Sequence, residues 1–156
     1  MKKLLFLLLI TSLSFAQNAN RKFESFKEAN NSLEINTSDG KYSIKAYSEK
    51  MVETSFIPKG ETYNINSQAV VLVPKSRITK VTENTNSLVF STSGIVVSIQ
   101  KSPFKISYLN KNKEFLSEKN GYSKKDSTDV LDFNIEPSEL LYGGGARRSE
   151  EHTSEL

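Results

Sequence analysis

Apolar and polar residues alternate with a period of two along much of the chain from residue 33 onward. Leu33 and Ile35 alternate with polar neighbours, residues 37–41 supply turn chemistry, and alternation resumes from Tyr42 to Ala46. Because successive side chains of a strand point to opposite faces, this pattern predicts a hairpin with one buried and one solvated face. A third strand is expected at residues 51–57, where Pro58 follows.

The same short-strand pattern continues toward the C-terminus. Further strands are expected at residues 69–73, 78–81, 88–90, 95–99, 104–109 and 130–135. Turn residues separate them at intervals of about 8–12 positions, which is typical of a β-sandwich or barrel. The polar stretch at residues 110–129 is expected to form loops, with exposed turns at 110–114 and 122–126. We therefore predict an all-β fold, an antiparallel β-sandwich, over residues 33–147.

The first residues have the layout of a secretory signal peptide. Lys2 and Lys3 precede an apolar run at residues 4–10, which is too short to span a bilayer comfortably. We expect cleavage between Ala16 and Gln17 and a periplasmic or secreted bacterial protein with no stable membrane anchor; an uncleaved anchor is the alternative. Residues 17–32 are expected to be a linker, either docked through two phenylalanines, Phe23 and Phe26, or wound into a short helical turn.

Residues 148–156 change character abruptly and are set apart from the predicted domain. Their sequence, RSEEHTSEL, resembles the translation of a sequencing adapter, and an ordinary polar tail is the alternative. His152, the only histidine of the chain, lies in this tail. The predicted domain therefore has no imidazole for Ser-His-Asp catalysis or metal ligation.

Composition narrows the function classes further. The chain has no cysteine, which excludes disulfides, thiol nucleophiles and zinc-thiolate sites. Its 21 Lys and Arg residues against 18 Asp and Glu residues give a net charge of +3, and these charges are scattered rather than grouped into a basic block. A nucleic-acid partner is therefore not expected, and neither is a cofactor.

Two groups of carboxylates are candidates for a site. Asp126, Asp129 and Asp132 recur at every third position and could hold a hard cation, but solvated surface is the favoured interpretation and no metal site is predicted. Glu136 and Glu139 could be a pair for glycoside chemistry, which needs two carboxyl groups about 5–9.5 Å apart. Surface positions are the favoured interpretation for these residues too.

A glycine triplet follows the last predicted strand. Gly143, Gly144 and Gly145 come directly after Tyr142 and lack a Cβ atom, so the backbone there can turn sharply or pass close to a ligand. A plain turn is the alternative. The aromatic residues that could stack on sugar rings, most of them expected in the core, are Tyr42, Tyr47, Phe56, Tyr63, Tyr108 and Tyr122.

The segment at residues 133–147, FNIEPSELLYGGGAR, resembles the junction at which glycoside hydrolase family 31 enzymes pass from an N-terminal β-sandwich into a catalytic barrel. Residues 44–48, 52–57 and 94–106 are also similar to that galactose-mutarotase-like domain. Many family members have Glu in the position of Ala146, so a role of that side chain does not transfer.

The resemblance implies a truncated N-terminal domain of an exported α-glycosidase. Its parent would hydrolyse or transfer α-glucosyl or α-xylosyl residues of α-linked oligosaccharides with retention, by two barrel aspartates that lie outside this chain. The chain alone would then be inactive, with no catalytic residue, its own missing barrel as partner, and Tyr142 to Gly145 near the substrate. A stand-alone carbohydrate-binding or adhesive sandwich is the alternative.

Overall fold

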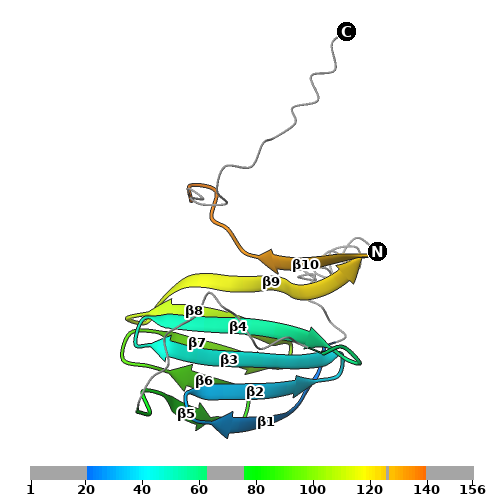
Figure 1. The fold of residues 1–156 in the computed structure, drawn as a ribbon. Coiled ribbons are helices and arrows are strands. Elements are labelled where there is room, and N and C mark those ends of the chain that lie inside the picture. The colour runs from blue at the N-terminus through cyan, green and yellow to red at the C-terminus, as the bar shows by residue number, and fades with distance from the viewer. Residues whose placement is uncertain (1–20, 63–75, 126, 140–156) are drawn as a thin grey trace, which may run out of the picture.

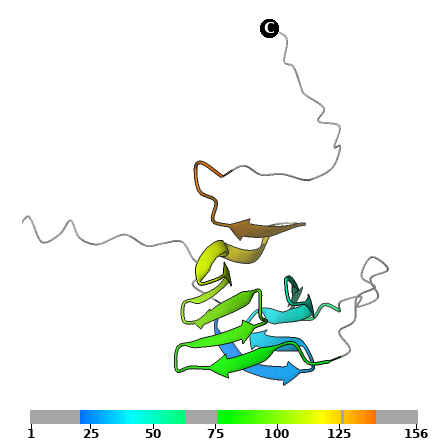
Figure 2. The ribbon, with the colours of Figure 1, turned by 90° about the vertical axis from the view of Figure 1, so that its left-hand side faces the viewer.

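The protein is a two-layer β-sandwich (Figures 1 and 2). A computed structural model describes residues 21–62, 76–125 and 127–139. These residues form ten strands, all paired antiparallel, and no helix. The prediction of an all-β antiparallel sandwich is confirmed. Within this part of the chain there is no helix long and apolar enough to cross a membrane.

The first sheet has four strands in the order β1-β2-β3-β4. Its strands are β1 (Phe23–Ala29), β2 (Ser32–Thr37), β3 (Gly40–Ser48) and β4 (Met51–Pro58). Neighbouring strands are joined by tight turns, so the sheet is a simple meander. The expected hairpin at residues 33–46 and the third strand at 51–57 correspond to β2, β3 and β4.

The second sheet has six strands in the order β10-β9-β8-β7-β6-β5. Its strands are β5 (Lys80–Glu83), β6 (Ser87–Ser91), β7 (Val96–Lys101), β8 (Phe104–Asn110), β9 (Lys113–Lys125) and β10 (Thr128–Phe133). Most lie where alternation predicted them. The strand expected at 69–73 lies outside the described residues.

The core lies between the two sheets and is supplied by alternate residues of both. The first sheet contributes a buried set that includes Leu33, Ile35 and Ile44, and the second contributes Phe90 and Ile99 among others. All five side chains are fully buried. Because every second residue of these strands points inward, the period of two in the sequence maps directly onto this core.

The six-stranded sheet continues past the four-stranded one, so that β9 and β10 lie at one end of the stack in both views (Figures 1 and 2). β9 pairs with β8 only as far as Ser117, and its second half pairs with β10. We call residues 118–133, the second half of β9 with β10, the arm. The segment that follows, residues 134–139, leaves the sheet beyond β10 (Figure 1).

Strand β1 corrects the expectation of a linker or helical turn before residue 33. Phe23–Ala29 pairs with β2 along its length. The register shifts between Phe23 and Ser25, so Glu24 is an extra residue, a β-bulge. The bulge brings Phe23 and Phe26 to the same face, where both pack against the core. Their spacing of three positions concealed the strand from a search for strict alternation.

Strand β9 corrects the expectation of polar loops at residues 110–129. Only Lys111 and Asn112 form the turn after β8, and both have positive φ angles, of 48° and 65°. Lys113–Lys125 is a single long strand, so the predicted exposed turn at 122–126 is wrong for residues 122–125. The strand was missed because two of its consecutive residues, Ser117 and Glu118, are polar yet buried, so buried apolar residues do not alternate with polar ones there.

Candidate functional site

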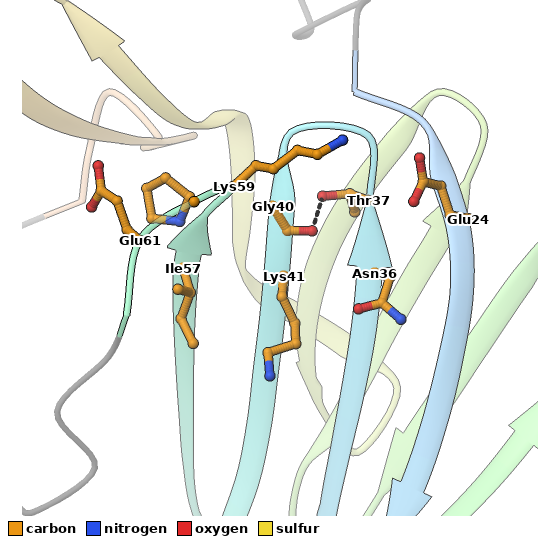
Figure 3. Close-up of a pocket in the computed structure, with 10 residues that line it drawn as sticks. Glu24, Asn36, Thr37, Gly40, Lys41, Ile57, Lys59 and Glu61 are labelled. Atoms are coloured by element: carbon orange, nitrogen blue, oxygen red, sulfur yellow. Dashed lines mark hydrogen bonds between the residues drawn. The ribbon is translucent and has the colours of Figure 1, made fainter.

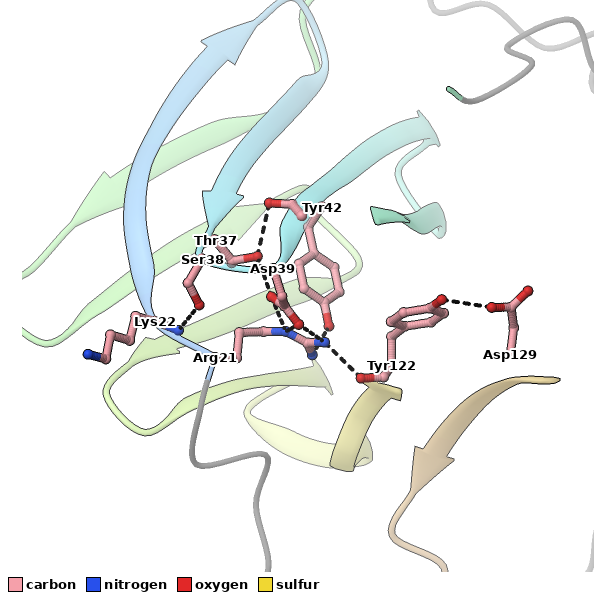
Figure 4. Close-up of polar contacts among 9 residues, drawn as sticks. Arg21, Lys22, Thr37, Ser38, Asp39, Tyr42, Tyr122 and Asp129 are labelled. Carbon is pink, nitrogen blue, oxygen red and sulfur yellow. Dashed lines mark hydrogen bonds and ion pairs between the residues drawn. The ribbon is translucent and has the colours of Figure 1, made fainter. Parts of the chain in front are cut away.

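A partly buried polar cluster joins both sheets at the base of the arm, and Figure 4 shows four of its members, Arg21, Asp39, Tyr42 and Tyr122. We call it the Arg21 cluster, and its members are Arg21, Asp39, Tyr42, Glu118 and Tyr122. Arg21 precedes β1, Asp39 lies in the turn between β2 and β3, and Tyr42 lies in β3. Glu118 and Tyr122 belong to β9. The cluster therefore brings together residues up to 101 positions apart in the sequence.

Arg21 is the centre of the cluster. Its side chain is 2% exposed, and its Nη2 lies 2.8 Å from Asp39 Oδ2 while its Nε donates to Asp39 Oδ1 at 2.9 Å. Nη1 donates to the Tyr42 hydroxyl at 2.7 Å, and Nη2 also donates to the Tyr122 carbonyl at 2.7 Å. The guanidinium carbon lies 4.7 Å from the centre of the Phe56 ring. A planar, permanently charged group suits this combination of fork-like pairing and stacking.

Glu118 is the second carboxylate of the cluster and is only 4% exposed. It receives hydrogen bonds from the Tyr42 hydroxyl and from the backbone N–H of Ile106. Tyr42 thus accepts from Arg21 and donates to Glu118, so its hydroxyl links the guanidinium to the carboxyl group. A register shift in the β9–β10 pairing, between Asp132 and Phe133, lies directly beside Glu118.

The two carboxylates of the cluster have opposite pKa shifts. Burial opposes ionisation of Asp39, but the hydrogen bonds and positive charge of Arg21 outweigh it and lower the pKa of Asp39. Burial raises the pKa of Glu118 to about 7, against the weaker opposing effects of Arg21, the Ile106 amide and Tyr42. Burial also raises the pKa of Tyr42, so its hydroxyl keeps its proton at neutral pH.

A surface hollow of about 310 Å³ lies beside the β2–β3 turn (Figure 3). Its wall carries the carboxylates of Glu24 and Glu61, the ammonium groups of Lys41 and Lys59 and the amide of Asn36. These groups could hydrogen-bond to hydroxyl-rich molecules. None of the described lining residues is aromatic, so the hollow lacks a surface on which a sugar ring could stack.

Of the three aspartates that are candidates for a metal site, the structure describes two, and these have different partners. Asp129 accepts a hydrogen bond from the Tyr122 hydroxyl at 2.7 Å, and Asp132 accepts one from Asn120 at 2.9 Å. Asp126 lies outside the described residues. In the part of the chain that is described, no three acidic or histidine side chains are grouped as a cation would require.

Glu136 and Glu139 lie together in an exposed turn after β10. The Glu136 N–H lies 3.3 Å from Glu139 Oε2, and the Glu139 N–H donates to the Glu136 carbonyl at 2.9 Å. Both line a shallow hollow of about 630 Å³ with the β8–β9 turn. The predicted substrate-adjacent residues, Tyr142, Gly143, Gly144 and Gly145, lie outside the described residues, as does the predicted cleavage site at Ala16 and Gln17.

Among the described aromatic candidates, Tyr42 is buried in the core, and Phe56 and Tyr108 are partly buried against it. Tyr42 is 1% exposed, and Phe56 lies between its ring and that of Tyr122, at 4.7 and 4.6 Å between centroids. The Tyr108 hydroxyl donates to Thr54 at 2.8 Å and that of Tyr47 to Glu53 at 2.9 Å. Tyr63 lies outside the described residues.

The sequence pattern does not identify Arg21, Asp39 and Glu118 as a group. Arg21 lies in a polar stretch without alternation, and Asp39 has the character of an ordinary turn residue. The one available signal was Glu118, which follows the apolar pair Phe115 and Leu116 inside a stretch that is long enough for a strand. A buried charge of this kind is defined by contacts between distant segments, which spacing along the chain does not reveal.

The chain matches a known family. A family model described as "Glycosyl hydrolase 31 N-terminal galactose mutarotase-like domain" matches residues 41–150, well over half of the chain. No curated protein matches the chain. The matched range begins in β3 and includes Tyr42, Glu118 and the whole six-stranded sheet, whereas Arg21 and Asp39 precede it.

Proposed function

Because the chain belongs to the family of glycosyl hydrolase 31 N-terminal galactose mutarotase-like domains, we propose that it is the non-catalytic sandwich of an exported α-glycosidase. The family match over residues 41–150 is the observation that carries this proposal. The sandwich fold of the described residues agrees with it.

We propose that the partner of this domain is a catalytic barrel of the same polypeptide. Support comes from large apolar side chains around β9 and β10 that are half exposed to solvent. Phe115 is 52% exposed, Leu131 is 52% exposed and Ile135 is 53% exposed. Exposed apolar groups of this size, close to the point where the chain leaves the sheet, suit a surface that another domain covers.

The substrates that we propose for the whole enzyme are α-linked glucosides or xylosides. In this proposal the barrel supplies both working carboxylates, and the sandwich holds one flank of the barrel in place. The hollow of about 310 Å³ beside the β2–β3 turn has no described aromatic side chain in its wall, which favours a supporting role over sugar binding.

Two measurements on the purified chain test this role. Incubation with aryl α-glucosides and α-xylosides should give no hydrolysis above the uncatalysed rate. Titration with maltose and isomaltose, followed by NMR, should give no binding at millimolar concentrations. Hydrolysis would contradict a non-catalytic domain, and millimolar or tighter binding would favour a carbohydrate-binding module. A Lys41→Ala variant would show whether such binding occurs in the hollow that Lys41 lines.

We propose export on the basis of the first 16 residues, in which Lys2 and Lys3 precede a short apolar run. Expression in a bacterium followed by mass spectrometry of the periplasmic or secreted protein tests this. The expected N-terminus is Gln17. Retention of the whole chain, with Met1 in place, would contradict it.

A further inference from the structure

The arm, residues 118–133, is held against the sandwich largely through the Arg21 cluster. Arg21 donates to the Tyr122 carbonyl, Tyr42 donates to Glu118, and the rings of Phe56 and Tyr122 lie 4.6 Å apart. An exposed ion pair between Lys124 and Glu61, 2.9 Å long, adds little because water screens it. The β8–β9 hydrogen-bonded register ends at Ser117, so the arm begins where the β-sheet pairing with the sandwich stops.

The cluster contains one strong cation for two carboxylates, of which Glu118 is buried and Asp39 is 40% exposed. Asp39 occupies the Nε–Nη2 edge of the Arg21 guanidinium directly, whereas Glu118 is reached through Tyr42. Among the described residues Glu118 forms no ion pair within 4 Å. The titratable and charged groups that act on it are Arg21 before β1 and two residues of other strands, Tyr42 in β3 and Tyr108 in β8.

Charge balance in this site therefore depends on the protonation of Glu118. With Glu118 neutral, the charges of Arg21 and Asp39 cancel, and no buried side-chain nitrogen or oxygen of the described residues lacks a hydrogen-bond partner. With Glu118 ionised, the cluster carries a net negative charge, and the Glu118 carboxylate, 4% exposed, is costly to keep away from water. Two movements would relieve this charge. Arg21 could move toward Glu118, which would break the hydrogen bond from Arg21 to the Tyr122 carbonyl. Alternatively, the arm could move outward, which would expose Glu118 to water.

We propose that the Arg21 cluster is a pH-responsive clamp, in which protonated Glu118 holds the arm against the sandwich and ionised Glu118 releases it. The arm is the part that moves, because beyond Ser117 the described portion of β9 pairs only with β10. Because the chain leaves the sheet directly after β10, the clamp would make the direction of that exit depend on the pH outside the cell.

The burial of Glu118 sets the pH at which the clamp acts. Burial raises its pKa to about 7, from an ordinary value of 4.5. Glu118 is therefore mostly neutral in mildly acidic surroundings and mostly ionised in alkaline ones. This range is one that a protein exported from a bacterium encounters.

Distance measurement between two spin labels tests the clamp on the whole chain. The chain has no cysteine, so a Lys27→Cys/Thr128→Cys double variant can be labelled selectively at β1 and at β10, both at exposed positions. At about pH 5.5 the distance distribution should be narrow, and at about pH 8.5 it should be broader and longer, with a midpoint near pH 7. An unchanged distribution over this range would overturn the proposal.

Two further variants separate Glu118 from other titrating groups. Glu118→Gln keeps the shape of the side chain and stays neutral, so its distribution should remain narrow at both pH values. Asp132→Asn is the matched control, because Asp132 is also on the arm but bonds to Asn120 outside the cluster, and it should keep the pH response. A pH response in Glu118→Gln would overturn the proposal.

Carbon-13 NMR of the Glu118 carboxyl in the unsubstituted chain gives an independent test if the glutamine variant does not fold. A midpoint near pH 7 supports the clamp. A midpoint near the ordinary value of 4.5 would overturn it.

Discussion

Gly121 and Asn31 both have backbone conformations that most residues avoid, and both lie beside buried polar groups. Gly121 has a φ of 64° and borders the Arg21 cluster, and Asn31 has a φ of 55° and is 4% exposed. The Asn31 side chain accepts a hydrogen bond from the Ile78 N–H at 2.8 Å and donates to the Ser76 carbonyl at 2.9 Å. It thereby joins the β1–β2 turn to the segment that leads into β5.

Gly121→Ala should destabilise the protein by about 2 kcal/mol or more, because it combines a backbone penalty with crowding. A Cβ atom at this position would lie 2.9 Å from Arg21 Nη1 and 3.1 Å from Glu118 Oε2. Chemical denaturation monitored by circular dichroism measures the change. Gly60→Ala is the matched control, since Gly60 also has a positive φ, of 89°, but open space around it. Equal losses in the two variants would contradict the crowding at Gly121.

Asn31→Ala should lower the free energy of unfolding by about 2–3 kcal/mol, because it leaves the partly buried Ile78 N–H without its partner and places alanine at a positive φ. Asn31→Gly loses the same side-chain hydrogen bonds, but glycine adopts a positive φ without strain. This variant should therefore be more stable than Asn31→Ala. Thermal unfolding of both variants measures the two effects. Asn30→Ala is the control, because Asn30 is exposed, and it should change the free energy of unfolding little. A neutral Asn31→Ala would contradict the proposed junction.

At the scale of whole elements, strict alternation predicted the regular strands and missed the irregular ones. Strands β2 and β3, and those from β6 to β8, have alternating inward and outward positions, so the sequence pattern reports them directly. β1 contains a bulge at Glu24, and β9 buries polar residues, so neither shows a period of two in apolar residues. The Arg21 cluster was missed for the same reason, because it depends on these two strands.

Deletion of both Glu24 and Ser25 tests the inward position of Phe23. Phe23 would then directly precede Phe26 and point to the opposite face, so it would lose its packing against the core and its contact with Lys101, 5.1 Å from the ring centre. We expect a loss of about 1–3 kcal/mol, the usual range for burying such a side chain. Deletion of Glu24 alone is the control: it removes the bulge but leaves the two rings two positions apart on one face, so it should cost less in the same thermal unfolding experiment. A double deletion that is as stable as the single one would contradict this role of Phe23.

At the scale of the whole molecule, the sequence predicts the sandwich fold and its family, but it does not predict the pKa shifts of the cluster's two carboxylates. Turn spacing and alternation predict the fold, and the family match covers residues 41–150. Glu118 and Asp39 acquire their properties from burial and from Arg21, which lies far from both of them in sequence. These two carboxylates make opposite contributions to stability as pH changes.

The free energy of unfolding should be largest in mildly acidic solution. Because the pKa of Glu118 is raised to about 7, its contribution is present below its ordinary value of 4.5 and is lost as pH rises through about 7, by at most on the order of 3 kcal/mol. The lowered pKa of Asp39 stabilises the fold above its ordinary value of 3.8, and this contribution is lost as pH falls through the folded value. Melting temperatures measured across this range should fall toward neutral pH in the parent and stay level in Glu118→Gln. A parent protein most stable near pH 8 would contradict the raised pKa of Glu118.

The central claim, that this sandwich serves a glycosidase, is tested most directly by the DNA that follows codon 147 in the source genome. We predict an open reading frame that continues for several hundred codons of alternating strand and helix, with two aspartates at the ends of barrel strands. Residues 148–156 would then be foreign to the gene. A stop codon within a few positions would contradict the claim and leave the carbohydrate-binding module as the better interpretation.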